Sequence, residues 1–94
     1  MSPLNPFIMS ALQDHYFDAK GKMPVIQAVR TVYNKIPAGA EFFGFRIWQE
    51  TRAITGRMGL YPDSAIRKLR LLRENGEADF ICLDQIESRY RKIR

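Results

Sequence analysis

Residues 61–76, which read YPDSAIRKLRLLRENG, decide the fold of this chain. Proline suits the first position of a helix, and asparagine followed by glycine suits the end, so these residues predict one helix between Pro62 and Gly76. At 100° per residue its apolar residues fall on one side, which must pack on a core. That side comprises Ala65, Ile66, Leu69, Leu72 and Arg73. The opposite side comprises Ser64, Arg67, Lys68 and Leu71, with Arg70 and Glu74 at the boundary.

Two further helices are predicted before this one. Pro24 opens the first, over residues 24–36, and the second covers about residues 47–55. Between them, residues 41–45 are short and aromatic, which indicates a strand. Residues 56–62 hold two glycines and a proline and predict a turn. The expected core faces are Val25, Ile26, Val29, Tyr33 and Ile36 in the first helix, and Ile47, Thr51, Ile54 and Met58 in the second.

A β-hairpin is predicted after the residue 61–76 helix, with strands at residues 78–84 and 88–93. Both faces of its first strand are apolar, since Phe80 and Cys82 point one way and Ile81 and Leu83 the other. One face can cover the helices, and the sequence leaves open which one. The other face needs a second cover, for which the N-terminal helix or a second subunit is a candidate.

The chain of 94 residues is expected to form one domain at residues 23–94, preceded by an N-terminal amphipathic helix within residues 1–22. Asn5-Pro6 opens that helix. Cys82 is the single cysteine, so an internal disulfide is excluded, and we expect a small buried side chain there. Neither a secretion signal nor an apolar run of membrane-spanning length is present. A cytoplasmic protein is expected, associated with the nucleoid if the source is prokaryotic.

Charge and motifs bear on the class of function. The net charge of +5 favours polyanionic partners. The carboxylates Asp14, Asp18 and Glu41 are isolated in sequence, and no phosphate-binding glycine loop, metal-ligand spacing or nucleophile with a base is present. We therefore expect no enzyme, no metal, no cofactor and no small-molecule ligand.

The order of elements over residues 24–94 resembles a winged helix-turn-helix DNA-binding domain. The resemblance is carried by the glycine-marked turn at residues 56–62, the helix after it, Gly76 at the entry to the hairpin, and Tyr90 on the return strand. It implies an α+β, mostly α fold with a three-helix core and a small antiparallel wing, here with an extra N-terminal helix. It also implies that the helix at residues 63–75 enters the major groove of duplex DNA.

The resemblance assigns residues to the two parts of a DNA interface. Ser64, Arg67, Lys68 and Leu71 would face the groove, where an arginine can pair with guanine and a leucine can contact a thymine methyl. Phosphate contacts would come from the turn, and from the return strand and tail. These residues are Arg57, Tyr61, Arg89, Arg91, Lys92 and Arg94.

Two alternatives stay open. The basic face of the helix at residues 63–75 could be an ordinary solvated surface. The domain could also be a protein-interaction module without DNA binding, given its two-faced apolar hairpin, Leu71 and the N-terminal helix. The candidate hairpin tip carries Asp84 and Glu87, which phosphate would repel, so we expect no insertion of this tip into a minor groove. The expected partners are double-stranded DNA and a second copy of the chain, bound through the N-terminal helix or the hairpin. A transcriptional regulator or a DNA-associated accessory factor is the leading hypothesis.

Overall fold

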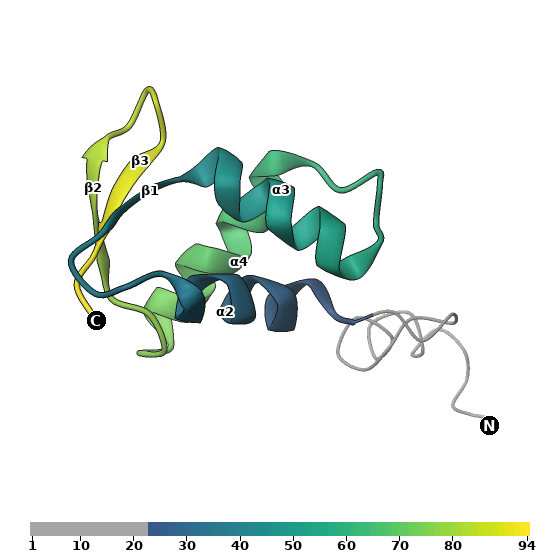
Figure 1. The fold of residues 1–94 in the computed structure, drawn as a ribbon, viewed down its shortest axis with the longest axis horizontal. Helices are drawn as coiled ribbons and strands as arrows, with labels where there is room; N and C mark the ends of the chain where they lie inside the picture. Colours follow the sequence, from purple (N-terminus) through teal and green to yellow (C-terminus); the bar gives the residue numbers. More distant parts are fainter. Residues whose placement is uncertain (1–22) are drawn as a thin grey trace.

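A computed structural model describes residues 23–94, so the helix predicted within residues 1–22 lies outside the described residues. The elements are α2 (Val25–Lys35), β1 (Glu41–Phe43), α3 (Gly44–Thr55), α4 (Pro62–Glu74), β2 (Phe80–Asp84) and β3 (Arg89–Lys92). In residues 23–94 three helices pack on one another, and the strands form an antiparallel sheet at one end of them (Figure 1). Roughly half of these residues are helical, which confirms the α+β class.

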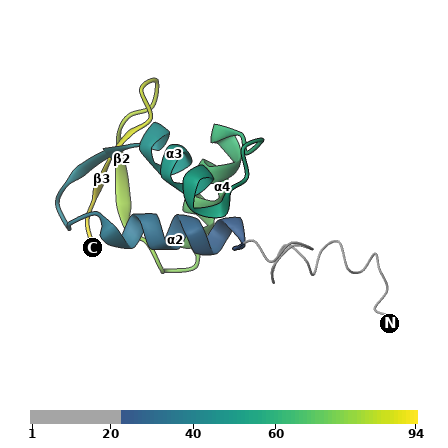
Figure 2. The ribbon, with the colours of Figure 1, turned by 45° about the vertical axis from the view of Figure 1, so that its right-hand side comes forward.

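The helices form close to where the sequence predicts them. Pro24 precedes α2, and Pro62 occupies the first turn of α4. The buried face of α4 consists of Ala65, Ile66, Leu69 and Leu72, as predicted. Arg73, predicted on the same side, is exposed instead, and its guanidinium lies 4.4 Å from the centroid of the Phe80 ring. In Figure 2, α2 runs below α3 and α4. No helix in the described part of the chain is long and apolar enough to cross a membrane.

The start of α3 differs from the prediction. The helix begins at Gly44, so the preceding strand is shorter than expected. The backbone N–H of Gly44 donates to the carbonyl of Ser88 at 2.8 Å, and a Cβ on Gly44 would lie 2.8 Å from Cδ1 of Ile66. The chain therefore passes tightly between the hairpin and α4, where only a glycine fits without displacing a neighbour.

The buried face of α3 was also predicted incorrectly at its C-terminal end. Ile54 is exposed by 37% and Met58 by 65%, whereas Thr55 is buried. The Thr55 hydroxyl donates to the carbonyl of Thr51 at 2.8 Å, which satisfies its polar atom inside the core. Thr55 therefore occupies a core position where the apolar Ile54 was predicted.

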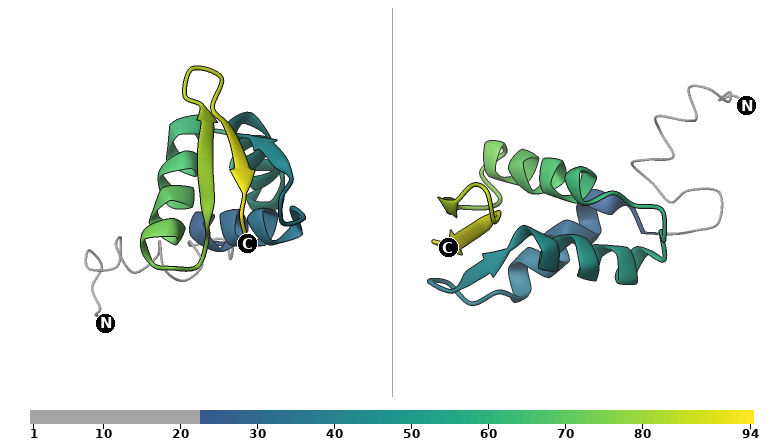
Figure 3. Two further views of the ribbon diagram at one scale, coloured as in Figure 1. Left: turned by 90° about the vertical axis from the view of Figure 1, so that its left-hand side faces the viewer. Right: turned by 90° about the horizontal axis from the view of Figure 1, so that it is seen from above.

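The sheet has the strand order β1-β3-β2 (Figure 3). Phe42 of β1 pairs with Tyr90 of β3, and their rings stack at 5.4 Å between centroids. Phe80 of β2 packs edge-on to the Tyr90 ring at 5.5 Å. These aromatic side chains cover the ends of the helices and join the core that includes Val29, Val32, Tyr33, Ile47 and Leu69.

One face of β2, the first strand of the hairpin, is buried and the other is exposed. Phe80 is 3% exposed and Ile81 is 46% exposed, so the Phe80 side faces inward. Cys82, which was predicted to be buried, is exposed. The pairing of β2 with β3 becomes irregular between Cys82 and Asp84, in a strand at the edge of the sheet. The cysteine therefore lies beyond the core although it follows Phe80 on the same side.

Candidate nucleic-acid interface

The face of α4 opposite the core carries exposed guanidinium groups. The Arg67 side chain is 76% exposed, and Arg70 is exposed beside it. Arg67 Nε lies 2.8 Å from Oδ2 of Asp63, one helical turn earlier. An exposed pair of this kind contributes little to stability and can exchange its carboxylate for another anion at small cost. Arg67 therefore lies on the outer side of α4, as predicted.

The other three residues predicted to face the DNA groove line a hollow of about 300 Å³. Ser64, Lys68 and Leu71 form its α4 wall. Val25 and Ile26 of α2 and Leu60 of the turn add apolar atoms, and Arg57 adds a second cation. Leu71 remains 38% exposed there. Lys68 and Leu71 thus line this hollow, which is defined by those seven residues, whereas Arg67 lies outside it.

The turn between α3 and α4 is held at both of its ends. Arg57 Nη2 donates to the carbonyl of Met23 at 3.1 Å, and Trp48 Nε1 donates to the carbonyl of Leu60 at 2.7 Å. Tyr61, at the start of α4, is 75% exposed. Of the two turn residues assigned to phosphate, Tyr61 projects into solvent and Arg57 lines the hollow.

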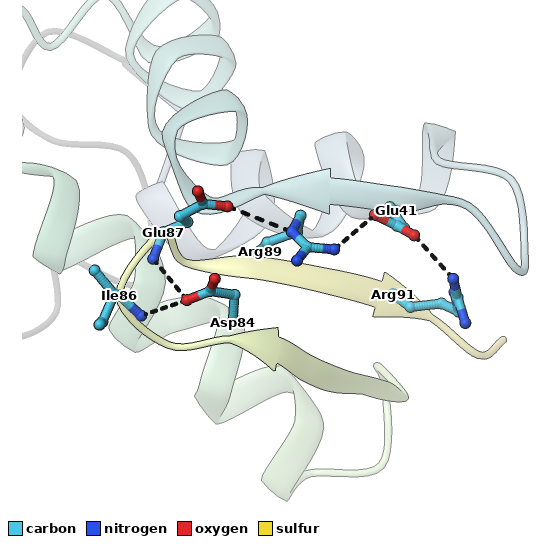
Figure 4. Close-up of polar contacts among 6 residues, drawn as sticks. All are labelled: Glu41, Asp84, Ile86, Glu87, Arg89 and Arg91. Carbon is cyan, nitrogen blue, oxygen red and sulfur yellow. Dashed lines mark hydrogen bonds and ion pairs between the residues drawn. The ribbon is translucent and has the colours of Figure 1, made fainter.

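The basic residues of β3 are engaged within the sheet. Arg89 Nη1 lies 3.2 Å from Oε1 of Glu41, and Arg91 Nη2 lies 2.8 Å from Oε2 of the same carboxylate (Figure 4). Hydrogen bonds from Arg89 and Arg91 lower the pKa of Glu41, and the bond to Glu41 raises the pKa of Arg89. Glu41 and Glu87 offset the charge of these two arginines, so this part of the sheet offers a phosphate little net positive charge.

The assignment of Lys92 to a phosphate contact was wrong. Lys92 is 7% exposed, and its Nζ donates to the carbonyls of Tyr33 at 3.1 Å and Ile36 at 2.7 Å. These carbonyls lie at the C-terminal end of α2, where a cation is favoured by the helix dipole. Lys92 therefore stabilises the join between α2 and the sheet and does not reach the surface. Arg94, the last basic residue, pairs with Asp79 at 3.1 Å.

The hairpin tip, residues 84–87, carries two acidic residues and one exposed apolar side chain. Asp84 Oδ1 accepts hydrogen bonds from the backbone N–H groups of Ile86 at 3.0 Å and Glu87 at 3.2 Å (Figure 4). Glu87 Oε1 lies 3.5 Å from Nε of Arg89. Ile86 is 96% exposed. An acidic tip does not suit a phosphate surface, and the exposed isoleucine was not singled out from the sequence.

A cluster on α3 was also not predicted. The Arg52 guanidinium lies 4.6 Å from the centroid of the Trp48 ring, and the Phe45 ring lies 5.3 Å from that ring. The spacing of these residues at three and four positions along a helix is the signal that would have joined them. Within residues 23–94, no three His, Cys, Asp or Glu side chains come together in a group that could hold a metal ion.

Comparisons with known proteins gave no match. No protein-family model, no curated protein and no solved structure matches the chain.

Proposed function

We propose that residues 23–94 form a winged helix-turn-helix domain that binds duplex DNA as a regulator or accessory factor, with α4 in the major groove. The order helix, strand, helix, turn, helix and hairpin supports this fold. The observation that carries the function is the outward position of Arg67 and Arg70 on α4, the helix after the turn. A helix fits the major groove, and an arginine fork matches the acceptors of guanine.

The distribution of cations refines the proposal. Lys92 is buried, and Arg89 and Arg91 share Glu41, so the hairpin contributes little positive charge. The proposed contacts are therefore Arg67 and Arg70 in the groove, with Tyr61 and the residues of the α4 N-terminus near the backbone. Lys68 lies at the flank of this surface.

A titration of fluorescently labelled random-sequence duplex by anisotropy tests the proposal. Binding at low salt with a dissociation constant of about 1–100 µM is expected for sequence-independent contacts. If about three phosphates are neutralised, log K falls with log salt at a slope of about −2.7. Absence of binding at protein concentrations of about 100 µM and low salt would contradict the proposal.

A second candidate function is a protein-interaction module without DNA binding. The apolar part of the hollow and the exposed Ile86 favour it, because both present apolar surface to solvent. The same titration separates the two functions, since only the first predicts salt-dependent binding of a duplex.

A further inference from the structure

Two surfaces of this domain lie outside the proposed groove contacts of Arg67 and Arg70. The first is the hairpin tip, where Ile86 is 96% exposed between Asp84 and Glu87. The second is the hollow, where Val25, Ile26, Leu60 and Leu71 lie beside the cations Arg57 and Lys68. One surface is a projecting apolar side chain with acidic neighbours, and the other is a concave apolar surface with basic neighbours.

The tip and the hollow complement each other in shape and charge. The hollow measures about 300 Å³, which is ample for one isoleucine side chain. An acidic tip entering it would place carboxylates near Lys68, which makes no ion pair with any of residues 23–94. Opposite charges around an apolar contact fix its register and disfavour other partners.

The tip is already ordered for such a contact. The Asp84 carboxylate accepts hydrogen bonds from the backbone N–H groups of Ile86 and Glu87, which reduces the backbone entropy that is lost when Ile86 is covered. The tip cannot reach the hollow of its own chain. The hairpin projects at one end of the domain, and the start of α2 and the turn at residues 56–61 lie at the other (Figure 1).

We infer that the hairpin tip of one copy docks in the hollow of a second copy, with Ile86 against Leu71, Leu60 and Ile26. The contact is head-to-tail, so each copy keeps one unused tip or hollow and further copies can add. The small contact area predicts weak association that grows with protein concentration. The occupant is a second copy because this chain itself presents both halves of the contact. The inference does not depend on DNA binding.

Sedimentation velocity of the full chain without DNA tests the contact through two single variants. Ile86→Asp removes the apolar tip, and Leu71→Asp places a negative charge in the hollow beside the expected carboxylates. Each variant alone is expected to associate about tenfold to a hundredfold more weakly than wild type. In an equimolar mixture, the intact tip of the Leu71→Asp variant can dock in the intact hollow of the Ile86→Asp variant. The remaining tip and the remaining hollow are both altered, so association stops at dimers.

The outcomes separate the alternatives. Loss in both single variants with dimers in the mixture supports the inference. Normal association of Leu71→Asp, a mixture that stays monomeric, or a wild-type chain that remains monomeric up to about 1 mM each overturns it. Circular dichroism checks that Leu71→Asp is folded, and Lys68→Glu replaces it if it is not. Because no DNA is present, a negative result leaves the DNA proposal standing.

Discussion

The ammonium group of Lys92 lies 4.5 Å from the centroid of the Tyr33 ring and donates a hydrogen bond to the Tyr33 carbonyl. A residue of the last strand thus completes the C-terminal end of α2. The Tyr33 hydroxyl in turn accepts from the backbone N–H of Asp79 at 2.9 Å, just before β2. Burial raises the pKa of that hydroxyl, so it stays protonated over the physiological range. Lys92 and Tyr33 together join the first helix to the hairpin.

Replacing Lys92 by methionine should lower the free energy of unfolding by about 1–3 kcal/mol, because two buried carbonyls lose a charged donor. Urea denaturation followed by circular dichroism measures the change. Arg91→Met is the matched control, since it removes a cation from the neighbouring exposed position and should cost less than about 1 kcal/mol. Duplex DNA affinity should be unchanged in Lys92→Met at temperatures where it is folded. Equal stability of the two variants would show that the Lys92 bonds contribute nothing.

Gly44→Ala should destabilise the protein although alanine is the better helix former. The new Cβ would lie 2.8 Å from Cδ1 of Ile66 and 3.2 Å from Cβ of Ser88, and overpacking of this kind costs about 1–3 kcal/mol. Thermal or urea unfolding measures it. In an Ile66→Val background, which removes Cδ1, the cost of the alanine should shrink. Gly59→Ala is the control, because a Cβ at Gly59 meets no atom within 4 Å. A stabilised Gly44→Ala protein would contradict the tight packing.

Local signals were sufficient for α4 and failed where distant segments meet. Pro62, Asn75 and the apolar spacing between them are contained in one segment, and α4 forms where they predict it. Lys92 and the carbonyl of Ile36 are far apart in sequence, so no local pattern distinguishes this lysine from an exposed one. Cys82 lies two residues after the buried Phe80, on the same predicted side of the strand. It is nevertheless exposed, and the pairing of β2 with β3 becomes irregular between Cys82 and Asp84.

The candidate site shows the same limit. A helical projection separates the buried and outer sides of α4, which placed Arg67 correctly. It does not show that α2 and the turn flank one edge of that outer side. Because they do, Ser64, Lys68 and Leu71 line a hollow from which Arg67 is excluded. The exposed Ile86 required the hairpin geometry, since an isoleucine in sequence suggests burial.

The folding stability of the domain at acidic pH should depend on Glu41. Its pKa lies below the ordinary value of 4.5 because Arg89 and Arg91 bond to the charged form in the folded state. The resulting stabilisation is complete above that unfolded-state value and is lost as the pH falls through the lower folded-state pKa. Glu41→Gln should therefore lose less stability than wild type between about pH 6 and pH 3. Glu74→Gln, which removes an exposed carboxylate without an ion pair among residues 23–94, is the control and should keep the wild-type slope.

Arg67→Ala should weaken the preferred duplex by about 1–3 kcal/mol and relax sequence preference, if Arg67 reads a base edge in the proposed complex. Selection from a random duplex pool, followed by anisotropy titrations, measures both effects. Arg46→Ala is a closely matched control. Arg46 also pairs with a carboxylate one turn away at 2.8 Å, but it lies on α3, and that carboxylate, Glu50, also pairs with Lys35 of α2. The control should keep wild-type affinity apart from the small effect of one lost charge. Equal losses of duplex affinity in both variants would show that net charge alone drives the binding, which would contradict the proposed role of α4.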